Sequence, residues 1–204
     1  MFDPTQIPHV WRAHSLAQST HALSSGFTAL DAALGGGWPS PALIELFTDV
    51  YGIGELRLVL PLLRQQAGDS GRPLLVWLNP PFVPNAVALA QYQLDARHWC
   101  ARELSPRDSL WSCEQALRSS AVAVVLLWLN GAPIGSLRRL KLACVATRTI
   151  AILYRPTHEA QQPSPAHVRI ALHAQRDALH VHVLKAQGQK PSKIELPLAL
   201  DIRS

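Results

Sequence analysis

The sequence predicts an α/β fold in which helices cover a mostly parallel sheet and antiparallel strands extend it at the C-terminal end. Two observations predict this class. Between residues 42 and 154, short apolar runs alternate with segments of helical length, an order that is typical of parallel strands joined by helices. After Pro156 the helical segments stop, and residues 168–172 and 179–184 alternate apolar and polar side chains as an antiparallel pair does.

The predicted order begins with a helix over residues 27–34, which Ser24 or Ser25 caps and which the glycines at 35–37 end. An apolar strand over residues 42–47 follows, and the loop over 48–54 leads from it into a helix over 55–67. Pro61 lies inside that helix and removes one backbone donor, so we expect a kink there. A strand over residues 73–78 and a helix over 85–92 come next, separated by a proline-rich loop.

The second half of the parallel part begins with a strand over residues 99–104 and a helix that runs from Ser105, its cap, to residue 118. Residues 121–129 are apolar on both faces of a strand, which places them at the centre of a covered sheet. A basic helix over residues 136–147 and a strand over 149–154 complete this part. After it we expect the antiparallel pair, with a turn near 176–177, and a third strand over 194–200.

This order divides the chain into an extended arm over residues 1–22, a core over 23–156, and strands over 157–204 that belong to the same domain. Hydrophobic residues make up 48% of the chain, and the net charge of +5 suits nucleic acid or an acidic protein face. The three cysteines lie far apart, which excludes a disulfide scaffold and a cysteine-based zinc site and favours the cytoplasm. We expect no membrane span and no secretory leader in residues 1–15.

The loop over residues 48–54 lies where α/β proteins bind phosphate, between a strand and a helix. A working phosphate loop ends in a glycine, a lysine that binds phosphate, and a serine or threonine that binds magnesium. In this chain the loop contains Asp49 and Gly52, and it ends in Gly54, Glu55 and Leu56. A carboxylate replaces the lysine and an aliphatic side chain replaces the hydroxyl, so we expect neither a nucleotide nor a metal ion to bind there.

The stretch that precedes this loop resembles a known family. Residues 25–39, with Gly26, the three glycines at 35–37 and Pro39, and the strand at 43–47 are similar to the stretch that enters the nucleotide site of RecA-type recombinases. A closer resemblance, over about residues 22–200, is to the ImuA family, which comprises RecA-like accessory proteins of inducible translesion DNA synthesis. The segments that carry the closer resemblance are residues 52–58, 77–82, 112–118 and 137–140.

The resemblance implies a RecA-like P-loop NTPase-type core and a non-enzymatic adaptor in SOS-induced translesion DNA synthesis and mutagenesis, with no cofactor. The implied partners are a Y-family-like polymerase homologue of the ImuB type, an error-prone C-family polymerase of the replicative type, and RecA as a further candidate. By position, the catalytic glutamate of RecA-type ATPases falls in the turn at residues 79–81, and the metal-directed aspartate falls near Trp128. The chain has a carboxylate at neither position, so we expect no catalytic residues.

A second resemblance leaves an alternative function open, that of an SOS-induced cell division inhibitor. The relevant family is SulA, whose members bind the tubulin-like division GTPase. This resemblance begins only near residue 54, whereas the ImuA family also matches residues 26–39 and the C-terminal strands. The segments similar to SulA are residues 58–66, 76–78, 103–106, 115–118 and 154–156.

A basic cluster on and just beyond the predicted helix 136–147 is a candidate contact for DNA or a partner protein. Its members are Arg138, Arg139, Lys141 and Arg148. Leu137, Leu140 and Cys144 form the buried stripe of this helix, which puts most of the basic residues on the opposite side. A solvated helix face explains the pattern, and a contact with DNA phosphate or an acidic partner is the alternative.

Two residue pairs complete the candidates. His180 and His182 share one strand face and are potential metal ligands, but the sequence places no third ligand beside them. Trp77 and Trp128 lie at strand ends, on the sheet edge where a RecA-like protein binds its nucleotide, and we expect them to fill the vacated pocket.

Overall fold

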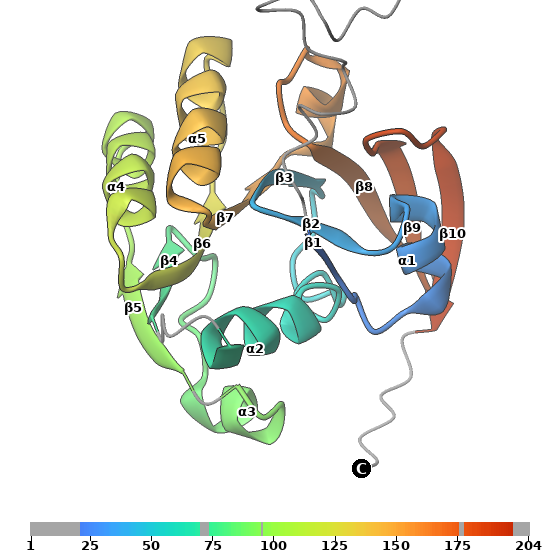
Figure 1. The fold of residues 1–204 in the computed structure, drawn as a ribbon, viewed down its shortest axis with the longest axis horizontal. Coiled ribbons are helices and arrows are strands. Elements are labelled where there is room, and N and C mark those ends of the chain that lie inside the picture. Colours follow the sequence, from blue (N-terminus) through green and yellow to red (C-terminus); the bar gives the residue numbers. More distant parts are fainter. Residues whose placement is uncertain (1–20, 70–73, 95, 176–177, 198–204) are drawn as a thin grey trace, which may run out of the picture.

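The computed structural model describes residues 21–69, 74–94, 96–175 and 178–197, and it has the α/β architecture that the sequence predicts (Figure 1). Its strands are β1 (His21–Leu23), β2 (Trp38–Ser40), β3 (Ala42–Phe47), β4 (Leu74–Leu78), β5 (Arg97–Ala101), β6 (Val122–Trp128), β7 (Ile150–Arg155), β8 (Val168–Gln175), β9 (Ala178–Lys185) and β10 (Ser192–Pro197). Its helices are α1 (Thr28–Leu34), α2 (Leu60–Asp69), α3 (Ala86–Gln91), α4 (Pro106–Arg118), α5 (Ile134–Thr147) and the 3₁₀ helix η3 (Thr157–Gln161).

The central sheet has eight strands in the order β10-β9-β8-β3-β7-β6-β4-β5. Strand β3 pairs in parallel with β7 on one side and with β8 on the other, and the strands from β7 to β5 are also parallel to their neighbours. Strands β8, β9 and β10 pair antiparallel. The expectation of a mostly parallel sheet with an antiparallel C-terminal part is therefore confirmed, and β8 joins the two parts in one sheet.

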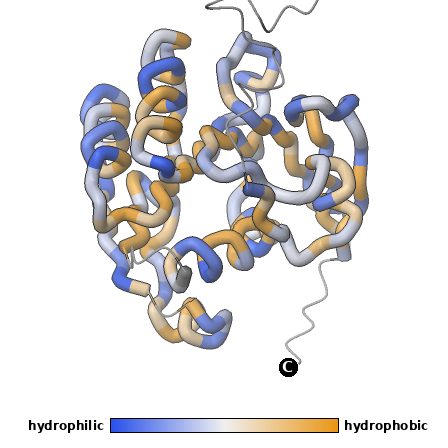
Figure 2. The backbone as a smooth tube through the Cα atoms, in the orientation of Figure 1, coloured by the Kyte–Doolittle hydropathy of each residue, from blue (hydrophilic) through white to orange (hydrophobic). Residues whose placement is uncertain are grey.

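Helices cover both faces of this sheet (Figure 1). Helices α4 and α5 pack side by side on one face through Leu117, Leu137 and Leu140, all of them buried. The other face is covered by α1, α2 and α3, whose leucines form the second core cluster. Hydrophobic residues follow the strands, and hydrophilic residues mark the outward sides of α4 and α5 (Figure 2). Every residue of β3, β6 and β7 is buried, as their continuous apolar runs predict.

The N-terminal part differs from expectation in two places. The cap of α1 is Phe27, not a serine, because the side chain of Asp31 already accepts hydrogen bonds from the Ser24 hydroxyl and the Ser25 N–H. His21 and Ala22, which we expected in the arm, lie in β1 and pair with β2; the rest of the predicted arm lies outside the described residues. Glycine is required at position 37, where a Cβ would lie 2.3 Å from a carbonyl oxygen of β1.

The expectation of a kink at Pro61 is wrong. Helix α2 begins only at Leu60, after a series of turns over residues 51–59, so Pro61 is the second residue of the helix. Backbone N–H groups in the first turn have no partner inside the helix, and a proline there removes nothing that the helix uses. Pro61 is therefore accommodated in the first turn of α2 at no cost in hydrogen bonds.

Two strands are shifted relative to their predicted ranges. Strand β5 occupies Arg97–Ala101 rather than residues 99–104, because Glu103 has a left-handed φ of 62° that ends the extended backbone. The side-chain amide of Asn79 then donates to the carbonyl of Leu104 and accepts its backbone N–H. Strand β10 occupies Ser192–Pro197, and residues 198–200 of the predicted strand lie outside the described residues. Within the described part of the chain, no helix is both long and apolar enough to cross a membrane.

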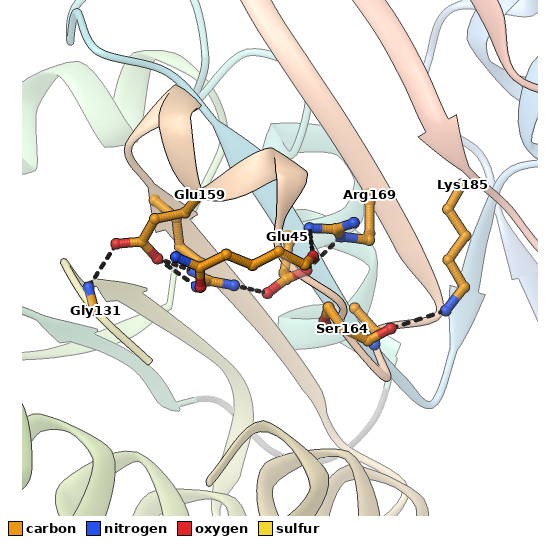
Figure 3. Close-up of polar contacts among 9 residues, drawn as sticks. Glu45, Gly131, Glu159, Ser164, Arg169 and Lys185 are labelled. Atoms are coloured by element: carbon orange, nitrogen blue, oxygen red, sulfur yellow. Dashed lines mark hydrogen bonds and ion pairs between the residues drawn. The ribbon is translucent and has the colours of Figure 1, made fainter. Parts of the chain in front are cut away.

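A buried ion network joins the parallel strands to the C-terminal part (Figure 3). The guanidinium of Arg155, at the end of β7, donates hydrogen bonds to Glu45 on β3 and to Glu159 in η3. The second oxygen of Glu45 accepts a hydrogen bond from Arg169 Nε on β8 at 2.8 Å, and Glu159 also accepts the N–H of Gly131 at 2.6 Å. Two carboxylates and two guanidiniums thus balance one another, with Glu45, Arg155 and Glu159 buried and Arg169 partly exposed.

Acid is expected to destabilise this fold through His167. Its Nδ1 accepts the N–H of Leu43 at 3.0 Å, and burial, with the positive charge of Lys141 as the next cause, lowers the pKa of His167 from 6.5 to about 4. Between these values the unfolded chain binds a proton that the folded chain does not. The free energy of unfolding should therefore fall as the pH drops through this window.

Denaturant titrations of the wild type and of His167→Gln, which cannot titrate, would measure that effect. The loss of stability between about pH 6.5 and about pH 4 should be larger in the wild type than in the variant. Equal losses in the two proteins would contradict the assignment to His167.

Candidate functional site

The candidate site lies at the carboxyl ends of β3, β4 and β6, where open α/β sheets bind their ligands. A cavity of about 540 Å³ opens there. Its walls come from residues 52–57 of the loop after β3, residues 80–85 of the loop after β4, and one side of α3. Most of the wall is apolar, and its aromatic members are Trp77, Phe82, Tyr92 and Trp128.

The loop after β3 binds a carboxylate of its own. Glu55 is 4% exposed, and its two oxygens accept the N–H groups of Gly52 and Ile53 at 3.0–3.1 Å. Gly52 and Gly54 have left-handed φ angles of 81° and 98°, a loop conformation that lets the two N–H groups converge. Groups that would face a phosphate in a working loop are therefore already paired with Glu55.

The remaining predicted loop residues have separate roles. Asp49 turns away from the cavity and accepts the N–H of Thr157 at 2.8 Å, and this hydrogen bond is the main cause that lowers the pKa of Asp49. Leu56 packs against the apolar core beside the cavity. The structure thus brings Gly52, Gly54, Glu55 and Leu56 to the cavity wall, and it places Asp49 against η3 instead.

A stack of aromatic rings forms the floor of the cavity. The rings of Trp77 and Trp128 lie 6.1 Å apart and nearly parallel, and Tyr154 stacks on the far side of Trp128 at 4.5 Å. The indole N–H of Trp77 donates to Nδ1 of His98 at 3.1 Å, and burial lowers the pKa of that histidine. The two tryptophans line the cavity rather than fill it, which corrects the expectation that they close the pocket.

Two polar groups in this stack are buried without a partner among the described residues. They are the indole N–H of Trp128 and the hydroxyl of Tyr154. Burial, and next the negative charge of Glu55, raises the pKa of Tyr154 well above its usual value, so the hydroxyl stays protonated. Orphaned donors of this kind are rare in folded proteins and mark a place where a water molecule or a ligand is expected.

The predicted basic cluster does not form one surface. Arg139 Nε lies 3.5 Å from Glu114 on α4, whose other oxygen pairs with Arg118 at 2.7 Å. Lys141 lies on the side of α5 that faces His167, where its charge helps to lower the pKa of that histidine. Arg138 is exposed, and Arg148 ends the helix in a left-handed conformation with a φ of 55°.

Any DNA binding by α5 is expected to disappear when Arg138, Arg139 and Lys141 are all changed to Glu, because the change reverses the charges that would contact phosphate. All three side chains lie outside the core, so the fold should be kept. Binding by the wild type should weaken steeply with added salt, since phosphate contacts release counterions. An electrophoretic mobility assay at low salt measures the effect, with the melting temperature as the control for folding. DNA binding that survives the triple change would place the contact elsewhere.

His180 and His182 lie on β9, where His180 faces His173 on β8 and Glu195 on β10. Among the described residues, no group of three or more histidine, cysteine, aspartate or glutamate side chains has the geometry to hold a metal ion. Sequence reasoning missed two parts of the site region: the cavity rim over residues 80–85 and the ion network beneath η3. A glutamate inside the otherwise apolar strand β3 was the available signal for the network.

Comparison with known proteins does not identify a family for this chain. No family model matches the sequence, and a search of curated proteins finds no match.

Proposed function

We propose that this protein is a non-enzymatic adaptor of SOS-induced translesion DNA synthesis and mutagenesis, built on a RecA-like core whose nucleotide site no longer operates. Its partners are a Y-family-like polymerase homologue of the ImuB type and an error-prone C-family polymerase, with RecA as a further candidate. The resemblance of residues 22–200 to the ImuA family is one support. The observation that carries the proposal is the bond between the Glu55 carboxylate and the N–H groups of its own loop.

The rest of the site supports a loss of ATPase chemistry. The position that corresponds to the catalytic glutamate falls in a turn whose Asn79 is engaged with Leu104 and Ser109. The position that corresponds to the metal-directed aspartate is near Trp128, whose ring lies between two other aromatic rings. An apolar cleft whose one lining carboxylate is already bound by its own loop suits a protein contact in the cytoplasm better than hydrolysis.

We predict that the purified protein does not bind ATP. A phosphate at this loop would have to displace the Glu55 carboxylate and then lie beside it without a lysine to offset the repulsion. Isothermal calorimetry with ATP and Mg²⁺ should show no saturable heat. Binding in the micromolar range would contradict the proposal.

Cell experiments separate the adaptor from the division inhibitor. Loss of the gene should lower damage-induced mutagenesis, and affinity purification from damaged cells should recover the two polymerases. The SulA-type alternative rests on the second resemblance, and it requires instead that overproduction makes cells filamentous through the division GTPase. Filamentation with unchanged mutagenesis in the deletion strain would replace the adaptor by the inhibitor.

A further inference from the structure

Exposed apolar side chains gather around the cavity at the carboxyl edge of the sheet. Phe82 and Val83 line it and are 70% and 63% exposed, and Val87 on α3 is 69% exposed. Val50, in the loop on the opposite side, is also mostly exposed. A single exposed apolar side chain needs no explanation, but a group of them around an apolar cleft is typical of an interaction site.

The charges around the cleft favour a neutral or acidic occupant. Residues 80–94 contain no charged side chain, and Glu55 is the one acidic residue among the described residues that line the cleft. Its carboxylate is bound by its own loop, so it offers nothing to an incoming cation. Arg57 lines the cleft, and the guanidinium of Arg102 donates a hydrogen bond to the carbonyl of Pro81 in the cleft wall at 3.5 Å. Opposite charges across an interface raise the rate of association and exclude wrong partners.

One residue of the cleft floor, Trp128, carries a buried hydrogen-bond donor. The indole N–H of Trp128 is buried and has no acceptor among the described residues, and Trp128 lines the cleft. A main-chain carbonyl brought in by another chain would supply that acceptor. Phe82 and Val83 line the cleft and stay mostly exposed, and a chain that continues beyond the cleft covers more of such surface than a small molecule can.

We propose that this cleft is the docking site for a short extended segment of a partner protein, which inserts one large apolar side chain between the tryptophan floor and the Phe82 rim. The segment carries acidic residues on both sides of that anchor, and one of its carbonyls accepts the indole N–H of Trp128. This inference rests on the proposed function, because an adaptor without a catalytic site acts through the surfaces that bind its partners.

Defined peptides test the chemistry of the occupant. The first probe is a five-residue peptide with tryptophan at its centre, a glycine on each side and aspartate at both ends. Two comparison peptides have alanine at the centre or lysine at the ends. Titration into the ¹⁵N-labelled full-length protein is followed by the indole N–H signals, assigned by single Trp→Phe changes.

The tryptophan peptide should bind saturably and shift the indole signal of Trp128. The signal of Trp38, whose N–H donates to the carbonyl of Leu58, should not move. The alanine peptide should bind at least about tenfold more weakly, because it lacks the anchor that is buried. The lysine-ended peptide should bind at least about threefold more weakly and lose that difference at high salt.

A matched pair of variants on α3 tests the place of binding. Ala88→Glu puts a carboxylate into the cleft wall, whereas Ala90→Glu puts the same group on the exposed surface of the same helix. The first change should weaken binding of the tryptophan peptide at least about tenfold, and the second should leave it within about twofold. If Ala88→Glu lowers the melting temperature, Phe82→Ser replaces it, because that side chain lies outside the core.

Several results would overturn the inference. These are no saturable binding, equal binding of the three peptides, or binding of free indole as tight as that of the tryptophan peptide, which indicates a small-molecule pocket. Polymerase recovery that is normal with Ala88→Glu would remove the cleft from the interface and leave the adaptor function standing. Peptide binding by a wild-type protein that recovers no polymerase would keep the cleft and overturn the adaptor function.

Discussion

Replacing Arg155 with methionine is expected to lower the free energy of unfolding by about 3–5 kcal/mol, because it removes one partner of a buried ion network. Arg155 is 0% exposed and is the residue that bridges Glu45 and Glu159. Without it, the described residues leave Glu159 the N–H of Gly131 and Glu45 the guanidinium of Arg169. Buried carboxylates with too little positive charge beside them are expensive, and this cost explains the size of the effect.

Urea or guanidinium titration measures this effect, and Arg118→Met is the matched control. Arg118 pairs with Glu114 on the surface and is 62% exposed, so its loss should cost less than about 1 kcal/mol. Adding Glu159→Gln to Arg155→Met removes one of the uncompensated charges and should recover part of the lost stability. Equal stability of Arg155→Met and Arg118→Met would show that the network contributes nothing.

Replacing Glu55 with alanine is expected to destabilise the protein by about 1–3 kcal/mol and to create an anion site. The change leaves the N–H groups of Gly52 and Ile53 without the charged acceptor that now binds them. Two convergent N–H groups in such a loop bind phosphate or sulfate. Inorganic phosphate should therefore raise the melting temperature of Glu55→Ala more than that of the wild type.

Glu55→Gln is the control for that experiment, because its amide oxygen keeps an acceptor in the loop. It should lose less stability than Glu55→Ala and should gain less from phosphate. A Glu55→Ala protein as stable as the wild type, with no response to phosphate, would contradict the role assigned to the carboxylate.

The sequence predicts well those elements whose boundaries depend on residues a few positions apart in the chain. Helix α4 begins where Ser105 and Pro106 indicate, because the serine hydroxyl accepts the N–H of Asp108 three residues later. The ion network could not be predicted in the same way. Arg155 and Glu45 are 110 positions apart, and their contact depends on β3 and β7 being neighbours in the sheet. One charge inside an apolar strand indicates that a partner exists and does not identify it.

The candidate site also has parts that the local sequence predicts and parts that depend on the folded chain. Glu55 and Leu56 are visible in the sequence as departures from a phosphate loop, and Trp128 as a departure from a metal-binding aspartate. The Glu55 carboxylate turns back onto Gly52 and Ile53 because of the backbone conformation of the loop. No local sequence pattern specifies that conformation. The cavity itself forms between the loops that follow β3 and β4, with Trp128 of β6 beside them, so only the assembled sheet brings its walls together.

The position of β3 between β7 and β8 has a consequence for synthesis of the chain on the ribosome. Every residue of β3 is buried in the finished sheet, yet Glu45 meets Arg155 only after 110 further residues have been made. At elongation rates of about 5–20 residues per second, that interval lasts roughly 5–20 s. During this time an apolar strand without either neighbour is exposed to other nascent chains, so productive folding in the cell should depend on a chaperone that binds the emerging N-terminal half.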